Sequence, residues 1–409
     1  MKPYLRAAVV AAALSLSAVV HGQTLTLEDA VARAIGASPQ GAANAARVDV
    51  LTAARAGADT RPPASIDVLA ENFGVGGDDL NRQIQIGATY SQRIERGGKR
   101  AARVAAADAD LDVARAEAVV RRLDVATAVQ RLYVEVQATE AAIGIARERV
   151  AIAEQLAREV GRRVAEARDP LFAGTRARTQ LAEAKVDLEL AEHARDAAMK
   201  RLASLWGGDA AGMTVTADRF LVLDPSAGPL QPAADLAIFE ARRRRAAAGL
   251  TLQQAGARTD PTWTAGPRYI GTGDVAVVAG VSLPLANRGL NRANIARAEA
   301  EARQVEADLA VERFQRTQAI ALAAEKVEET RHEVEAIRDR VVPGAQRTLA
   351  EVRAGYNRGG FTFLDVSTAQ IALHEARARM VRVAARHHEA RVELDRLTGR
   401  FGAFAQGTQ

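Results

Sequence analysis

The chain lacks cysteine altogether and is poor in aromatic residues. None of its 409 residues is Cys and 4% are Phe, Trp or Tyr, although 48% are hydrophobic. The absence of Cys excludes disulfides, thiolate metal sites and cysteine nucleophiles. A hydrophobic fraction with so few large side chains suits long, closely packed helices better than a core of bulky residues.

Lysine is scarce as well: five of the 55 basic residues are Lys and 50 are Arg. Acidic residues interleave with them along the chain, and the net charge is only +5. A nucleic-acid-binding protein usually clusters its basic residues and adds aromatic side chains. We therefore expect no nucleic-acid partner, and we interpret the densest basic run, 242–245, as a solvated or inter-protomer patch.

Residue patterns typical of a metal site or a catalytic site are missing too. The six His residues are dispersed except for His387 and His388, and neighbours on a helix diverge by about 100°, which makes a poor chelate. No Ser, His and Asp follow one another in an order typical of a nucleophilic site. We expect no enzyme activity, no cofactor and no metal site.

Long apolar runs are confined to the N-terminus. Lys2 and Arg6 precede an apolar stretch, 7–20, which is too short to span a membrane as a helix. Val20 and Gly22 supply the small residues of a cleavage site. Residues 1–22 are therefore interpreted as a secretory signal peptide, and the mature protein as exported.

One internal duplication is present, at an offset of 191 residues. The strand-like segment 84–90 corresponds to 275–281, and Gly98 corresponds to Gly289. The apolar positions of the next segment follow the same offset: Val129, Val136, Ile143 and Val150 correspond to Ile320, Val327, Val334 and Val341. No gap is needed between about residue 82 and residue 150, so we infer two copies of one unit.

Each copy begins with two strand-like segments joined by a glycine-containing turn. They are 65–73 and 82–94 in the first copy, and 261–270 and 274–285 in the second. Ile84, Ile86 and Tyr90 alternate with polar residues, so one face of the strand is apolar and the other is polar or small. This alternation predicts a β-hairpin in each copy.

Each hairpin is followed by a long helical stretch with a seven-residue apolar repeat. Residues 99–169 contain no Pro, and at 1.5 Å per residue such a run reaches roughly 100 Å. The repeat predicts a seam between closely packed helices, and pairs such as Glu159 and Arg163 are expected to form ion pairs on another face. We expect Pro343 to kink the equivalent helix of the second copy.

These patterns predict a mainly α protein built from a duplicated strand–strand–long helix–helix unit. The predicted parts are a signal peptide (1–22), an N-terminal helix (23–64), a first barrel hairpin (65–98), a first long helical hairpin (99–205), an equatorial α/β segment (206–258), a second barrel hairpin (259–290), a second long helical hairpin (291–398) and a disordered tail (399–409).

Two isolated β-hairpins are only marginally stable in water. A closed barrel in a membrane would pair their backbone groups and bury their apolar face in lipid. Four strands cannot close around a pore, so several protomers must contribute. The pattern therefore predicts a ring of identical chains in an outer membrane.

Several motifs, in order along the mature chain, resemble the TolC-like outer-membrane efflux factors. They are 25–34 (LTLEDAVARA), 281–289 (VSLPLANRG) and 356–370 (YNRGGFTFLDVSTAQ). The segment 93–100 (RIERGGKR) is most similar to the heavy-metal branch, represented by the cobalt–zinc–cadmium resistance component. The resemblance implies a homotrimer with a twelve-stranded transmembrane barrel in the outer membrane and an α-helical tunnel in the periplasm.

The same resemblance implies partners and cargo. The chain would be the passive exit duct of a tripartite system, with a periplasmic adaptor protein and an inner-membrane resistance–nodulation–division pump, and would export divalent heavy-metal cations. Drug efflux or type I secretion by the same fold remains an alternative. A soluble periplasmic coiled-coil adaptor is a second alternative, although two symmetric strand pairs are not expected in one.

The resemblance also implies a gate at the helical tip. Asp365 matches an aspartate of the constriction, where three carboxylates would attract cations and raise one another's pKa. Its alternative role is an acid in the first turn of a helix. A second acidic ring found in some members would fall on Thr368. Tyr356 matches a gate tyrosine, with helix packing as the alternative.

Three glycines, Gly355, Gly359 and Gly360, lie at the same tip, where the resemblance implies adaptor docking. Glycine permits positive φ, so a role in the turn itself is at least as well supported by the residues.

Overall fold

The computed structural model describes residues 23–72, 84–223 and 236–402. The predicted signal peptide, the turn after the first strand and residues 403–409 of the predicted tail lie outside this range. The start of the tail was predicted wrongly. Gly399 ends the last helix in a left-handed conformation, yet Phe401 is buried against the helices around Leu25 and Tyr133, because an apolar side chain two residues beyond the helix can still reach the core.

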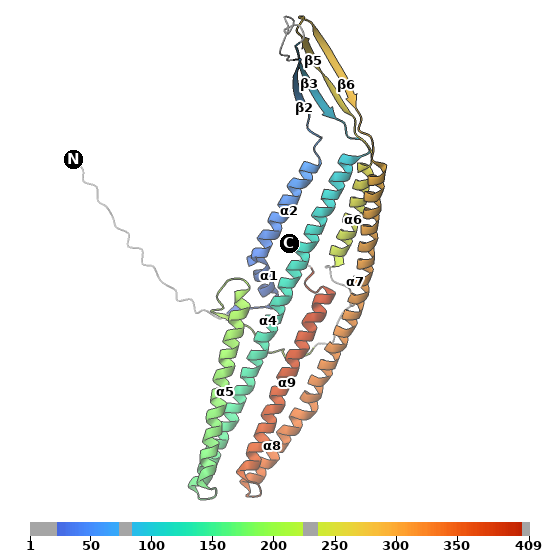
Figure 1. The fold of residues 1–409 in the computed structure, drawn as a ribbon. Helices are drawn as coiled ribbons and strands as arrows, with labels where there is room; N and C mark the ends of the chain where they lie inside the picture. The colour runs from blue at the N-terminus through green and yellow to red at the C-terminus, as the bar shows by residue number, and fades with distance from the viewer. Residues whose placement is uncertain (1–22, 73–83, 224–235, 403–409) are drawn as a thin grey trace, which may run out of the picture.

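The molecule is elongated, with a β-sheet at one end and paired helices running to the other (Figure 1). The first unit contributes the hairpin of α4 (Lys99–Ala165) and α5 (Leu171–Ser204). The second contributes α7 (Arg288–Ala336), α8 (Val342–Asn357) and α9 (Phe363–Thr398). These are called the first and second helical hairpins below.

The predicted seven-residue seam is confirmed over its first half. The buried seam residues are Val129, Val136 and Ile143 in α4 and their counterparts Ile320, Val327 and Val334 in α7. Further along α4, a second seven-residue register, which lies three residues beyond the first, is buried at Ala146, Ala153 and Val160. Many of the buried residues are Ala and Val, which let neighbouring helices approach closely.

The second unit departs from the prediction at Pro343. In place of a simple kink, a five-residue π-helical segment, Ile337–Val341 (η2), separates α7 from α8. Pro343 has no backbone N–H, and its ring would clash with the carbonyl four residues earlier. A wider turn just before the proline relieves that clash.

The N-terminal segment forms two helices, whereas one was predicted. Helix α1 (Leu27–Ala37) is capped by Thr26, and α2 (Pro39–Ala58) begins directly after Ser38. Pro39 ends the first helix because the residue before a proline disfavours the α conformation. Proline is well tolerated in the first turn of the second helix.

A small equatorial layer surrounds the middle of the molecule. The two-residue strands β1 (Gln23–Thr24) and β4 (Met213–Thr214) pair in parallel. Helix α6 (Ala237–Gly256) packs between α4 and α7 on the side toward the sheet.

The sheet of the described residues has four antiparallel strands in the order β2-β3-β5-β6. Their bounds are Ser65–Glu71, Gln85–Arg93, Thr262–Ile270 and Val275–Ser282. Strand β3 of the first unit pairs with β5 of the second, with Tyr90 opposite Ala265. The two predicted hairpins therefore form one continuous sheet.

The register places apolar and polar side chains on opposite faces. Ile66 lies opposite Tyr90, and Trp263 opposite Val281. The apolar face consists of Ile66, Val68, Ile86, Tyr90, Trp263, Tyr269, Val275, Val277 and Val281. All of them are exposed, so this face has no covering element within the described part of the chain.

Among residues 23–72, 84–223 and 236–402, no helix carries an apolar stretch long enough to cross a membrane.

Candidate functional site

The helical end of the molecule carries two short turns that lie side by side (Figure 1). One joins α4 to α5, and the other joins α8 to α9. The two turns occupy corresponding places in the duplicated unit. The first follows α4, which ends at Ala165, and the second follows α8, which ends at Asn357. The candidate gate residues from the sequence all lie at or just after the second turn.

Three side chains join the two turns: Arg163, Asp169 and Tyr356, called the tip cluster below. Arg163 Nε and Nη2 donate to the two carboxylate oxygens of Asp169, at 2.9 and 3.3 Å. The Tyr356 hydroxyl donates to Asp169. Arg163 also donates to the Tyr356 carbonyl at 3.2 Å and lies over its ring, 4.3 Å from the centroid.

The tip cluster is shielded from solvent, which strengthens these contacts. Tyr356 is 1% exposed, and burial and its bond to Asp169 raise its pKa above the ordinary range. Burial alone would raise the pKa of Asp169, but the hydrogen bonds from Arg163 and Tyr356 hold it below its ordinary value. Asp169 is therefore charged at neutral pH, and the cluster holds the two helical hairpins together.

The sequence pattern did not reveal the contact between Arg163 and Asp169. It paired Arg163 with Glu159 along one helix, and this was wrong: Arg163 binds Asp169, and Glu159 binds Arg353 of the second hairpin at 2.8 Å. Asp169 entered the prediction only as the last residue of the Pro-free stretch 99–169. The correspondence of the two turns under the duplication was the signal that could have found it.

Asp365 is an acid in the first turn of α9, which is the alternative role that the sequence left open. Its carboxylate Oδ2 accepts hydrogen bonds from the Thr362 backbone N–H at 2.8 Å and from the Thr362 hydroxyl at 2.7 Å, which completes a capping box for α9. These bonds lower the pKa of Asp365. The side chain is exposed, and within one chain a capping role does not exclude a second role toward other copies.

The other predicted tip residues serve the local structure. The Thr368 hydroxyl donates to the Leu364 carbonyl at 2.9 Å. Gly359 has φ +85°, and a Cβ on Gly355 would lie 2.1 Å from the Phe361 ring. Gly360 donates its N–H to the Gly355 carbonyl at 2.9 Å. The glycines therefore shape the turn.

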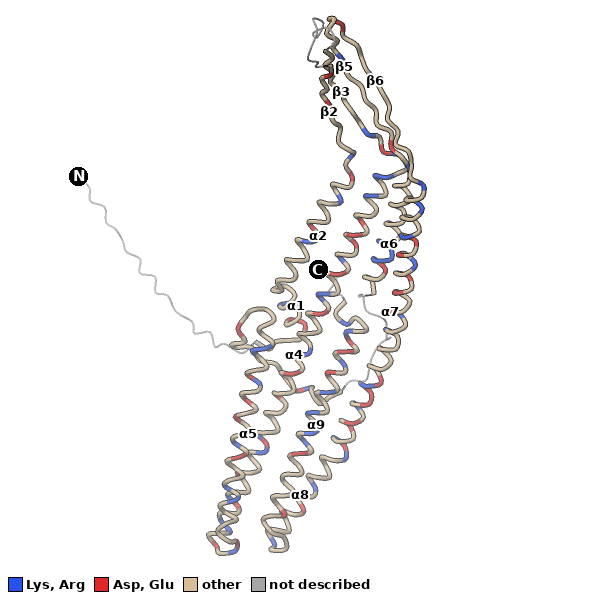
Figure 2. Tube along the Cα trace, in the orientation of Figure 1, with Lys and Arg blue, Asp and Glu red and all other residues tan. Residues whose placement is uncertain are grey.

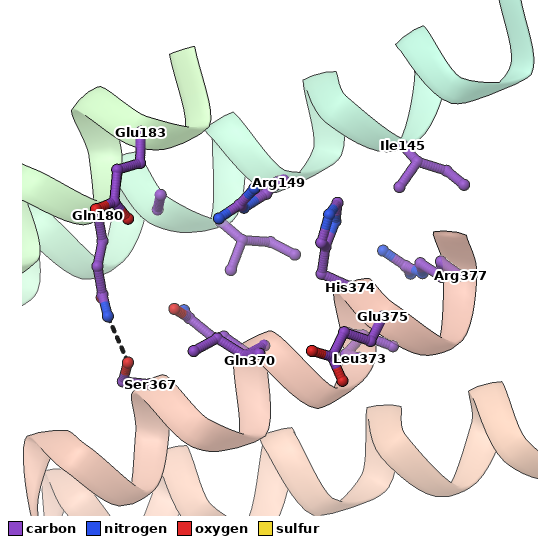
Figure 3. A pocket seen from close by; sticks show the side chains of 13 residues that line it. Ile145, Arg149, Gln180, Glu183, Ser367, Gln370, Leu373, His374, Glu375 and Arg377 are labelled. Carbon is purple, nitrogen blue, oxygen red and sulfur yellow. Dashed lines mark hydrogen bonds between the residues drawn. The ribbon is translucent and has the colours of Figure 1, made fainter. Parts of the chain in front are cut away.

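Between the tip and the middle of the molecule, a cavity of about 260 Å³ lies between α4, α5 and α9. Gln180 bonds Ser367 across it, while Arg149 and His374 lie on its opposite walls (Figure 3). Gln370 Nε2 and His374 Nδ1 are buried and have no partner among the described residues. Burial and the nearby Arg149 lower the pKa of His374, which favours the neutral form of its ring.

His387 and His388 each contact a backbone carbonyl. The tautomer that satisfies both rings has His387 Nδ1–H donating to the Val327 carbonyl at 3.2 Å and His388 Nε2–H donating to the Phe220 carbonyl at 2.8 Å. Burial lowers the pKa of His387 to about 4. Within the described ranges, no three His, Cys, Asp or Glu side chains gather as a metal would need.

The basic run 242–245 is exposed to solvent, and two of its side chains form ion pairs with α4. Arg244 pairs with Asp112 at 3.5 Å, and Arg245 pairs with Asp110. Both arginines stay exposed, at 56% and 62%, which agrees with the interpretation as a solvated patch. The ion pairs form because α6 packs along α4 and places the two charged faces opposite each other. Charges of both signs alternate along all the helices, whereas the sheet is largely uncharged (Figure 2).

The arrangement defines a class of protein. A sheet with an exposed apolar face suits a lipid environment, and the long helices that continue from it end in two joined turns. An outer-membrane channel with a helical extension combines these parts.

The chain belongs to the outer membrane efflux protein family, whose sequence profile matches residues 31–208 and 230–400. It is an outer-membrane efflux channel whose helices extend into the periplasm. The family is one of channels, not of enzymes, and membership overturns the alternative of a soluble adaptor.

Known proteins share both its sequence and its fold. The chain is 26% identical to the cobalt-zinc-cadmium resistance protein CzcC of Cupriavidus metallidurans over 385 residues, which are 92% of this chain and 90% of the relative. The crystal structure of VceC from Vibrio cholerae superposes with a TM-score of 0.71 at 20% identity, covering 91% of this chain and 96% of that one. CusC superposes with a TM-score of 0.74 at 16% identity, covering 91% and 92%.

Proposed function

We propose that the chain is the exit duct for divalent heavy-metal cations in a tripartite efflux system. The observation that carries the cargo is its similarity to CzcC, a cobalt-zinc-cadmium resistance protein, along nine-tenths of both chains. A duct needs no tight cargo site, which agrees with the dispersed His residues and mixed charges of the described helices. Selection of the ion then belongs to the pump.

The working form in this proposal is a homotrimer that closes a twelve-stranded barrel. Strands β2 and β6 are the two edges of the sheet, and an edge strand needs a partner. Apolar side chains are also exposed on the outer helices, at Val186 and Leu190 of α5 and at Val311 and Phe314 of α7. A neighbouring copy would cover both the edges and these side chains.

The partners are a periplasmic adaptor and an inner-membrane resistance–nodulation–division pump, with the adaptor docked at the helical tip. The tip exposes Leu171 and Phe172 on the first turn and Phe361 beside Gly359 and Gly360 on the second. Exposed apolar residues at the end of an elongated protein suit an end-on contact with another protein.

The cargo is tested in a bacterial strain from which the outer-membrane component of a metal-efflux system has been deleted, while the pump and adaptor of that system are kept. Expression of the chain is expected to restore growth in zinc, cobalt or cadmium salts and to lower the cell-associated metal. Restored tolerance of hydrophobic drugs without any gain in metal tolerance would contradict the proposed cargo.

We propose that the three copies of Asp365 in the trimer form a ring of carboxylates at the closed tip. Asp365→Ala is expected to raise single-channel conductance in planar bilayers and to abolish block by multivalent cations. Asp365→Asn is the matched control for the cap, because its amide oxygen can still accept from Thr362 while the charge is lost. If Asp365→Asn behaves like wild type and only Asp365→Ala changes conductance, the residue acts as a helix cap and not as a charged ring.

A further inference from the structure

The seven-residue seam of the second unit shifts by one residue near its π-helical segment. Val327 and Val334 are buried seven residues apart, but the next position, Val341, is 46% exposed. Its neighbour Val342 is 9% exposed. Leu349 and Tyr356 then follow at intervals of seven and are also buried.

The second register of the same helix shifts in the same way. Thr330 and Ile337 are buried seven residues apart. The next residues packed against the core are Ala345 and Val352, eight and fifteen residues beyond Ile337. Both registers therefore contain one extra residue, and both gain it in the same short stretch.

The π-helical segment accounts for this extra residue. The Val342 N–H bonds the Ile337 carbonyl five residues earlier, whereas an α-helix would use the carbonyl four residues earlier. Such a turn holds one residue more than an α turn while the helix axis continues. Pro343 fixes the location, because it cannot donate the α-helical bond to Asp339.

The equivalent helix of the first unit has no such shift. Helix α4 runs as one α-helix from Lys99 to Ala165. Its buried residues Ala146, Ala153 and Val160 keep the interval of seven. The two copies therefore differ by one residue between the shared seam and the tip.

We propose that the π-helical segment positions Tyr356 in the tip cluster. An uninterrupted α-helix with the same residues would present Val341, Thr348 and Gly355 to the seam, and would turn Tyr356 away by about 100°. The segment restores Tyr356 to the buried side, where it meets Arg163 and Asp169. The inference rests on the proposed function only in that the tip cluster, through the gate role that the resemblance implies for Tyr356, is taken to help close the duct.

The test uses single-residue deletions at equivalent sites of the two units, Arg338 and Arg147, which are 191 residues apart. Both side chains are exposed, at 45% and 62%. Deleting Arg338 removes the extra residue, so the segment becomes α-helical and Tyr356 keeps its place. Deleting Arg147 turns the end of α4 by about 100° and takes Arg163 out of the tip cluster.

The readout is the coupling between Asp169→Asn and Tyr356→Phe in the unfolding rate of the full-length protein in detergent. In the wild type and in the Arg338 deletion, the double variant is expected to unfold more slowly than the product of the two single factors predicts. In the Arg147 deletion, the unfolding rate of the double variant is expected to equal the product of the two single factors, or the protein fails to assemble. Arg338→Ala and Arg147→Ala control for the loss of each side chain and are expected to keep the coupling.

Loss of coupling or of assembly in the Arg338 deletion would overturn the inference. Retained coupling in the Arg147 deletion would overturn it as well, because any helix would then absorb a lost residue. Bilayer conductance of the same proteins separates the two proposals. If coupling follows the expected pattern while conductance is unaffected by Tyr356→Phe, the positioning role stands and the closing role of the tip cluster fails.

Discussion

The two ends of the molecule place their side chains in opposite ways. In the sheet, apolar residues point outward, and Val277 is 82% exposed. At the helical tip, the ring of Tyr356 is 1% exposed and sits among charged groups. The two ends therefore suit two environments. Lipid around the sheet favours exposed apolar side chains, whereas water around the helices favours buried ones.

The polar side chains differ between the two ends as well. On the polar face of the sheet, Arg268 donates to Gln85 at 3.3 Å and Ser91 donates to Asp67 at 3.2 Å, in contacts that are exposed or only partly buried. At the tip, the carboxylate of Asp169 is shielded and receives donors from two residues. Loss of a partner should therefore cost more in the helical part than on the polar face of the sheet.

The largest effect is expected from placing a charge on the apolar face of the sheet. Val277→Arg should destabilise the membrane-inserted state by up to about 2–4 kcal/mol, the cost that Arg reaches on the lipid-facing side at the middle of a bilayer. Ala276→Arg is the matched control, because the neighbouring side chain points to the polar face. Trimer yield in the outer-membrane fraction is the measurement. Equal losses for both variants would contradict the assignment of the two faces.

Acid should weaken the helical part more than the sheet, through His387. Its pKa in the folded protein is about 4, below the ordinary 6.5. The unfolded chain therefore binds the proton more readily, and the stability contributed by neutral His387 is complete above pH 6.5 and is lost as the pH falls toward 4. The expected loss is about 3 kcal/mol at pH 4.

His387→Asn tests this pH dependence. The Asn side chain can still donate to the Val327 carbonyl but does not titrate. The free energy of unfolding, measured from pH 7.5 to pH 4, should fall less steeply for the variant than for the wild type. Some slope should remain, because the pKa values of His374 and His388 are lowered as well. Identical slopes would show that His387 does not carry the effect.

The smallest effect is expected from removing single tyrosine hydroxyls at the two ends. Tyr356→Phe should lower the free energy of unfolding by about 1 kcal/mol, the worth of one hydrogen bond, and should lengthen the open time of the channel. Tyr90→Phe is the matched variant in the sheet, where the hydroxyl bonds Gln92 at 3.1 Å in an exposed contact. It should leave both quantities unchanged. A channel that opens equally in both variants would argue against a closing role for Tyr356.

Local periodicity predicted most of the fold. Alternation at 84–90 predicts a strand, and a seven-residue repeat predicts a helix, because each pattern follows from the geometry of a few neighbouring residues. The duplication then gave the order of the parts. The π-helical segment escaped prediction, because one extra residue in a long repeat is visible only when the buried side of the helix is known.

The candidate site was predictable only in part. Tyr356 and Asp365 were found through the resemblance of one turn, but the sequence left open whether they pack or gate. Arg163 and Asp169 meet Tyr356 across 193 and 187 residues of chain. Contacts at such separations depend on how two hairpins pack, which no local pattern in a single sequence reports.

The pairing of β3 with β5 has a consequence for the order of biogenesis. The first helical hairpin joins neighbouring segments and can form while the rest of the chain is still crossing the inner membrane. The sheet cannot form at that stage, because β3 pairs with β5, and Tyr90 lies opposite Ala265. Closing so long a loop costs conformational entropy before the contacts between the strands form. The apolar face is thus completed only after β6 has emerged, later than the first helical hairpin and before the second.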